Sequence, residues 1–211
     1  MNMKQERLEN LADGIFAIVM TLLVLELRVP VLTEFTNVIL AREFVQFIPY
    51  LMSYITSFAV LYTFWHSHHF IASIYAKNIT VDVSTINAVF LFFIGLIPFT
   101  AHLLATYHTE QFAIFIFSIH IIVIGLVLFY MRHFIKHSLE IENNLSTRSE
   151  ENHSKARILF PVFCALLAMG VSFFSPTGSL AILTLGILFN FSRKSTKIIF
   201  SILRVFNSHL E

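Results

Sequence analysis

The stretch RLENLADGIFAIVMTLLVLELRVP, residues 7–30, decides the fold, because its apolar part is long enough to cross a membrane as a helix. Such a helix needs roughly 20 mainly apolar residues to cover about 30 Å of hydrocarbon. Asp13 and Glu26 flank the apolar part, and Pro30 ends the run as it would end a helix. We therefore expect a first membrane span at about residues 11–31.

A cleaved signal peptide is the alternative for the same stretch, because Lys4 and Arg7 precede the apolar residues. The acids at both ends and the lack of a following small-x-small cleavage site argue against it. We expect a retained first helix.

The rest of the chain has the same apolar character. Of the 211 residues, 56% are hydrophobic, only 13% are charged and 24 are phenylalanine, whereas soluble domains carry about 25% charged residues. Further spans are predicted at about 44–65, 86–106, 111–131, 157–175 and 179–192, the last two separated by the breaker Ser175-Pro176-Thr177-Gly178. The sequence thus predicts an all-α, polytopic membrane protein with six transmembrane helices per subunit, in contact with membrane lipid. We expect one domain over residues 1–211, with a polar cytoplasmic loop near 132–157.

Composition also excludes several classes of function. Fourteen Lys and Arg against 13 Asp and Glu leave no basic surplus for binding nucleic acid. The single cysteine, Cys164, provides neither a disulfide nor a cysteine-based metal site within one chain. We find no Gly-x-Ser-x-Gly elbow, phosphate-binding glycine loop or His-Glu-x-x-His motif. The chain is therefore predicted to be no enzyme and to need no cofactor.

The positive charges predict the orientation of the chain. With six spans, the two termini and the second-to-third and fourth-to-fifth loops share one side of the membrane, whereas Arg28 and Arg42 lie on the other. That partition predicts a multi-pass protein of the inner cell membrane with both termini in the cytoplasm. The cytoplasmic side would hold twelve of the 14 basic residues: Lys4, Arg7, Lys77, Arg132, Lys136, Arg148, Lys155, Arg157, Arg193, Lys194, Lys197 and Arg204.

The first span carries a helical stripe. Ile18, Leu22 and Leu25 follow the i, i+4, i+7 spacing that places side chains on one face, and Thr21 lies beside them. Such a stripe by itself is typical of core or lipid-facing surface. The acids at its two ends are costly near hydrocarbon unless they face a partner or water, which makes this helix the functional candidate.

The same string resembles the bacterial branch of the endolysosomal potassium channel family, transmembrane protein 175. The family signature is Arg, three residues, Phe-Ser-Asp-Gly, then a helix of the type Phe-Ala-Ile-x-x-Thr-Leu-Leu-Val-Leu-Glu. Leu11 and Ala12 replace its Phe-Ser. A Trp followed by paired histidines at 65–69, and the residues Asn87 and Ile97-Pro98-Phe99, are also similar to the family. The matching residues of the first span are Arg7, Asp13, Gly14, Phe16, Ala17, Ile18 and Thr21 to Glu26.

The resemblance implies a homotetramer of six-span subunits, with the first helix of each lining a central pore for potassium ions. Ile18 would then form the narrowest constriction and Leu22 and Leu25 would continue the apolar lining. Thr21 would present its hydroxyl to the permeating ion. There is no Thr-Val-Gly-Tyr-Gly filter loop, so discrimination would rest on pore width, the threonine hydroxyls and partial dehydration.

The resemblance also implies a polar cluster that anchors the first helix at its cytoplasmic end. It would consist of Arg7, Asp13, Trp65 and either His68 or His69. Static hydrogen bonding is the expected role of its histidines, and pH sensitivity through their titration is the alternative.

Histidines suggest two other hypotheses. His66, His68 and His69 could bind a metal, although adjacent residues cannot share one helix face. His102 and His120 could ligate haem across helices, whereas lone intramembrane histidines more often hydrogen-bond a neighbouring helix.

The sequence therefore predicts a potassium-permeable cation channel. The alternative is an ion- or proton-coupled secondary transporter, in which Asp13, Glu26 and the histidines would relay charge.

Overall fold

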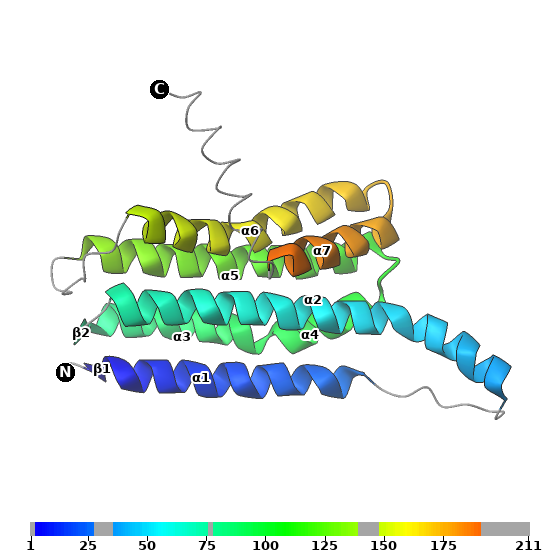
Figure 1. Ribbon diagram of the computed structural model, residues 1–211, viewed down its shortest axis with the longest axis horizontal. Helices are drawn as coiled ribbons and strands as arrows, with labels where there is room; N and C mark the ends of the chain where they lie inside the picture. Colours follow the sequence, from blue (N-terminus) through cyan, green and yellow to red (C-terminus); the bar gives the residue numbers. More distant parts are fainter. Residues whose placement is uncertain (1–2, 28–35, 76–77, 139–147, 191–211) are drawn as a thin grey trace, which may run out of the picture.

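The computed structural model describes residues 3–27, 36–75, 78–138 and 148–190, which form an elongated bundle of helices running along one long axis (Figure 1). The first helix, α1, continues into a tighter 3₁₀ turn, η1. The elements are α1 (Gln5–Leu22), η1 (Leu23–Glu26), α2 (Asn37–Tyr75), α3 (Val81–Gly95), α4 (Ile97–Thr106), α5 (Gln111–His137), α6 (Arg148–Ser172) and α7 (Pro176–Asn190).

Five stretches of the described residues are helical, long and apolar enough to cross a membrane, which confirms an all-α polytopic class. They are Gln5–Glu26, Asn37–Ser73, Val81–Thr106, Gln111–His137 and Ser154–Ser172. The predicted sixth span is a shorter apolar helix, Pro176–Phe189. At 1.5 Å per residue, the 15 residues of α7 cover about 22 Å, less than the roughly 30 Å of a hydrocarbon core.

The second helix is much longer than predicted. α2 has 39 residues, or about 58 Å, whereas the sequence predicted a span at 44–65. Its first turns extend beyond the ends of the neighbouring helices (Figure 1). The apolar run located this span but not the ends of the helix, and Pro49 lies inside the helix.

The third span is broken, which the sequence analysis missed. α3 ends at Gly95 and α4 begins at Ile97, with Pro98 in its first turn, because a proline lacks the N–H that would continue the ladder and suits the first turn of a new helix. His120 of α5 bridges the break. Its Nε2 lies 2.9 Å from the Phe93 carbonyl oxygen and its Nδ1 2.9 Å from Thr100 Oγ1.

The predicted breaker between the last two helices is partly helical. Pro176 is the first residue of α7, and the Ser175 hydroxyl accepts a hydrogen bond from Gly178 N–H at 3.1 Å. Ser175 therefore acts as the N-cap of α7.

Close helix packing holds the second half of the bundle together. A Cβ atom at Gly125 of α5 would lie 2.4 Å from Val162 Cγ2 of α6, and one at Gly186 of α7 would lie 2.8 Å from Cys164 Sγ. Small residues at such crossings let backbones approach, as is typical of membrane helices.

Two short strands depart from the all-α prediction. β1 (Met3–Lys4) pairs antiparallel with β2 (Asn78–Ile79), which joins the start of α1 to the start of α3. Two residues per strand are too few to produce a recognisable alternating pattern.

The polar interval predicted near 132–157 is largely helical in its described part. α5 runs to His137 and α6 begins at Arg148, and Arg132 is only 3% exposed. Residues 139–147 lie outside the described residues. So do Arg28 and the basic tail residues Arg193, Lys194, Lys197 and Arg204, which entered the orientation argument.

Candidate functional site

α1 has two distinct faces. One face is buried against α2 and α3 and consists of Leu8, Ala12, Phe16, Val19 and Leu23. The opposite face carries the stripe singled out from the sequence, and it is open to the surroundings of the single chain. Ile18 is 60% exposed and Leu25 65% exposed, with Leu22 between them also exposed. The helix therefore packs one apolar face into the core of the chain and leaves a second apolar face exposed.

The free face changes in bulk along the helix. Gly14 and Ala17 are exposed on it, and a Cβ atom at Gly14 would meet nothing within 4 Å. Ile18, Leu22 and Leu25 follow towards the far end. The face thus has small side chains at Gly14 and Ala17, between the bulky exposed side chains of Leu11 and Ile18.

Thr21 lies on the same open side of α1. Its hydroxyl donates to the Ile18 carbonyl oxygen at 2.7 Å. Because a hydroxyl has one proton and two lone pairs, this bond uses the proton and leaves oxygen lone pairs facing outward. An outward oxygen lone pair is the group that a cation requires.

Trp65 and Asp13 form the polar contact between α1 and α2. The indole Nε1–H donates to Asp13 Oδ1 at 2.8 Å. His69 is stacked on the Trp65 ring, with centroids 6.0 Å apart and an interplanar angle of 19°. Asp13, Trp65 and His69 therefore come together at one place on the bundle.

His68 points elsewhere, into the interior. It is 2% exposed, and its Nε2 lies 2.7 Å from Asn87 Oδ1 of α3, so Nε2–H is the donor. Its ring lies parallel to Phe90, with centroids 5.3 Å apart, and Phe16 of α1 lies within 6.5 Å. Of the paired histidines, His69 is the one beside Trp65.

Arg7 is not joined to this cluster. Among the described residues, no hydrogen bond or ion pair connects its exposed side chain to Asp13, Trp65 or either histidine. Helix geometry gives the reason, since residues six apart at 100° per residue point about 240° apart around the axis.

A third histidine makes a contact that the sequence did not suggest. Nη1 of Arg157 on α6 lies 3.1 and 3.2 Å from the two ring nitrogens of His66. The two residues are 91 positions apart in the sequence, so no local pattern could pair them. His66, His68 and His69 thus face three different partners, and the part of the chain that the structure describes contains no group of three or more His, Cys, Asp or Glu side chains placed to hold a metal ion.

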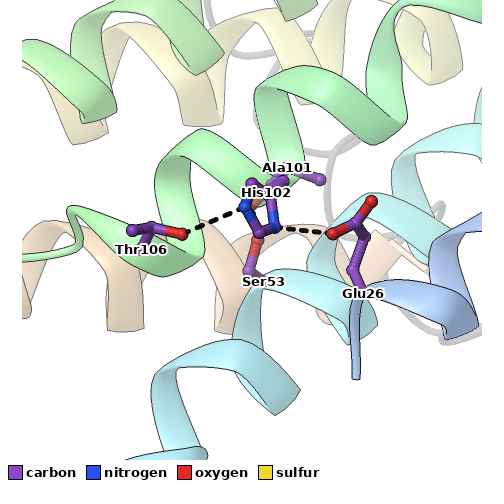
Figure 2. Close-up of polar contacts among 5 residues, drawn as sticks. All are labelled: Glu26, Ser53, Ala101, His102 and Thr106. Atoms are coloured by element: carbon purple, nitrogen blue, oxygen red, sulfur yellow. Dashed lines mark hydrogen bonds and ion pairs between the residues drawn. The ribbon is translucent and has the colours of Figure 1, made fainter. Parts of the chain in front are cut away.

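The far end of α1 carries a second acid contact (Figure 2). Glu26 Oε2 lies 2.6 Å from His102 Nδ1 on α4, and Thr106 Oγ1 lies 3.5 Å from His102 Nε2. The adjacent Ser53 hydroxyl of α2 donates to the Ala101 carbonyl oxygen at 2.7 Å. As expected of lone intramembrane histidines, His102 and His120 each contact a neighbouring element.

The fold and this site define a multi-pass α-helical membrane protein whose first helix has one apolar face that the rest of the chain leaves exposed. Comparison with known proteins narrows the class. The model of the family described as "Endosomal/lysosomal potassium channel TMEM175" matches residues 7–98. Over these residues, which make up less than half of the chain, the sequence is therefore similar to the TMEM175 family of potassium channels.

Similarity to individual proteins extends beyond the matched region. A potassium channel of Chryseobacterium sp. (strain P1-3) is 26% identical over 174 residues, which cover 82% of this chain and 85% of the relative. A potassium channel of Chamaesiphon minutus is 28% identical over 172 residues, or 80% of this chain and 84% of that relative. The crystal structure of a lysosomal potassium-selective channel TMEM175 homolog from Chamaesiphon minutus superposes with a TM-score of 0.71 at 26% identity, over 88% of this chain and 95% of that one. The family resemblance read from the sequence is thereby confirmed.

Proposed function

We propose that this chain is the subunit of a homotetrameric potassium channel in the cell membrane, with α1 of each subunit lining a central pore. One observation carries the proposal: α1 presents the stripe Ile18, Leu22 and Leu25 on a face that its own subunit leaves open. The two bacterial relatives are potassium channels, which supports potassium as the permeant ion.

The polar contacts support a static frame for that helix. Asp13 is held by Trp65 near the start of α1, and Glu26 is held by His102 at its far end. Leu8, Phe16 and Val19 anchor the opposite face in the core. A helix fixed at both ends and along one side can hold a pore of constant width, which is what discrimination by partial dehydration requires.

Along the free face, Ile18 would form the constriction. The small side chains of Gly14 and Ala17 leave space on the face directly before Ile18, where the bulky stripe of Ile18, Leu22 and Leu25 begins. An apolar ring of this kind excludes water when narrow, so the same ring would serve as gate and selectivity element. The lone pairs of Thr21, directed outward, would replace part of the ion's hydration.

In the proposed orientation, both termini lie in the cytoplasm, the Asp13–Trp65 contact lies near the cytoplasmic entrance, and Glu26 lies at the opposite mouth. Each chain would contribute one first helix, so four copies would supply the four pore helices.

Two measurements test the proposal. The mass of the purified complex, corrected for bound detergent, should equal four chains. Liposomes that contain the protein should release potassium down its gradient without a second substrate, at a rate that responds to voltage. A monomeric mass, or potassium flux that saturates and requires a co-transported ion, would contradict the channel and favour the secondary transporter.

A further inference from the structure

The 3₁₀ turn at the end of α1 determines where Glu26 points. In a 3₁₀ helix, residues i and i+3 lie one above the other, so Glu26 lies over Leu23. Leu23 is 1% exposed and belongs to the packed face. Glu26 is therefore directed towards the neighbouring helices, whereas Leu25 beside it is directed outward.

The carboxylate of Glu26 is only partly enclosed. Glu26 borders a small crevice with Tyr50 and Tyr54 of α2 and Ala105 of α4, and its side chain is 30% exposed. Its negative charge is therefore held in place and still lies within reach of ions in solution. Among the described residues, no basic side chain lines this crevice.

His102 is the group that fixes the carboxylate. Its Nδ1 lies 2.6 Å from Glu26 Oε2, and its Nε2 faces Thr106 Oγ1 at 3.5 Å. A neutral imidazole with its proton on Nδ1 donates to the carboxylate and accepts from the threonine, so the contact does not need a charged histidine. A neutral His102 can thus hold the Glu26 side chain in position while the carboxylate keeps its negative charge.

α4 itself is a firm support for His102. Ser53 of α2 donates to the Ala101 carbonyl oxygen, one residue before His102. His120 of α5 contacts Thr100 and the Phe93 carbonyl oxygen across the break between α3 and α4. The break at Leu96 makes α4 a separate short helix, and these two contacts fix it against α2 and α5.

We propose that His102 is a positioning residue for conduction: it holds the carboxylate of Glu26 at the far mouth of the pore, where the negative charge raises the local concentration of entering potassium ions. The inference rests on the proposed function, because it assumes that α1 lines the pore. Fixed charge at the entrance of a narrow passage concentrates counter-ions, and the effect disappears when salt screens the charge.

Single-channel current at two salt concentrations tests this role. At about 10 mM potassium chloride the screening length is about 30 Å, and at about 1 M it is about 3 Å. At low salt, Glu26→Gln should reduce the current of ions entering from the Glu26 end at least about two-fold, with little change in the opposite direction. At high salt the variant and the wild type should conduct equally.

The histidine variants separate positioning from general damage. His102→Leu removes the donor and should lower the low-salt current from the Glu26 end, as Glu26→Gln does. His102→Asn keeps an N–H donor near the position of Nδ1 and should retain the low-salt current of the wild type. Asp82→Asn and His137→Gln, which alter an acid at the start of α3 and a histidine at the end of α5, at the opposite end of the bundle, are the matched controls and should leave the current from the Glu26 end unchanged.

A stability measurement that needs no current separates this inference from the proposed function. In purified protein, the loss of melting temperature in the Glu26→Gln/His102→Leu double variant should be smaller than the sum of the two single losses. Additive losses would overturn the pairing. Equal effects of His102→Leu at low and high salt would overturn the electrostatic role. If the wild type passes no potassium while the pair is coupled, the channel proposal fails and the contact stands.

Discussion

Trp65 and Asp13 lie 52 positions apart in the sequence and are joined by a hydrogen bond of 2.8 Å between the indole Nε1 and a carboxylate oxygen. It is the polar link between the start of α1 and the long helix α2, on the stretch of α1 that also bears the exposed Gly14 and Ala17. Substitution of either Trp65 or Asp13 tests how much this hydrogen bond contributes to stability.

Trp65→Phe keeps most of the ring and removes the donor. We expect the free energy of unfolding to fall by about 1 kcal/mol, as for a hydrogen bond to a charged acceptor at a partly exposed site. Asp13→Asn keeps an acceptor oxygen and should cost less. Thermal unfolding in detergent measures both, and an unchanged melting temperature in Trp65→Phe would show that the contact contributes nothing.

Ile18→Asn should increase potassium current, because a polar ring at the constriction holds water that an apolar ring expels. Leu126→Asn introduces the same side chain at an exposed position of α5 and serves as the control, with no change expected. Currents are compared at matched protein density in liposomes or planar bilayers. Equal currents for Ile18→Asn and the wild type would remove Ile18 from the constriction.

Thr21→Ala should weaken the preference for potassium over sodium, because it removes the oxygen whose lone pairs face outward. Thr85→Ala removes a threonine with the same kind of bond to its own helix, from Thr85 Oγ1 to the Val81 carbonyl oxygen at 3.0 Å on α3. Reversal potentials under bi-ionic conditions provide the measurement. A shift in both variants, or in neither, would argue against a role of Thr21 in selectivity.

Gly125→Ala should destabilise the bundle by about 1–3 kcal/mol, because the added methyl group would overlap Val162 and β-branched side chains have little freedom to move. Val162→Ala in the same chain should recover much of the loss. Gly170→Ala is the matched control on α6, since nothing lies within 4 Å of its Cβ position, and it should be neutral or stabilising by up to about 1 kcal/mol. Equal melting temperatures for the two single alanine variants would contradict the close crossing.

Those features that depend on local pattern were predictable from the sequence. The run of apolar residues located the spans, and the i, i+4, i+7 spacing of Ile18, Leu22 and Leu25 identified a face that the structure leaves exposed. The Asp13 and Trp65 motif positions were singled out through the family resemblance, and they lie within hydrogen-bonding distance.

Features that depend on distant contacts were not predictable. The pairing of Glu26 with His102 requires the 3₁₀ turn and the position of α4, neither of which has a signal in the local sequence. Pro98 lies in an apolar stretch whose hydropathy predicts one continuous span, so hydropathy alone did not indicate the break before α4. The contact between His66 and Arg157 joins helices from opposite halves of the chain.

Cys164 is buried where α6 meets α7, with Gly186 directly against its sulfur atom. Thiol reagents added to the folded protein should therefore leave the native chain unlabelled, although it contains a cysteine. That makes the unmodified sequence a ready background for accessibility mapping. Single cysteines placed in turn at Ile18, Leu22 and Leu25 would report by their labelling with water-soluble reagents which of these positions meets water and which meets acyl chains.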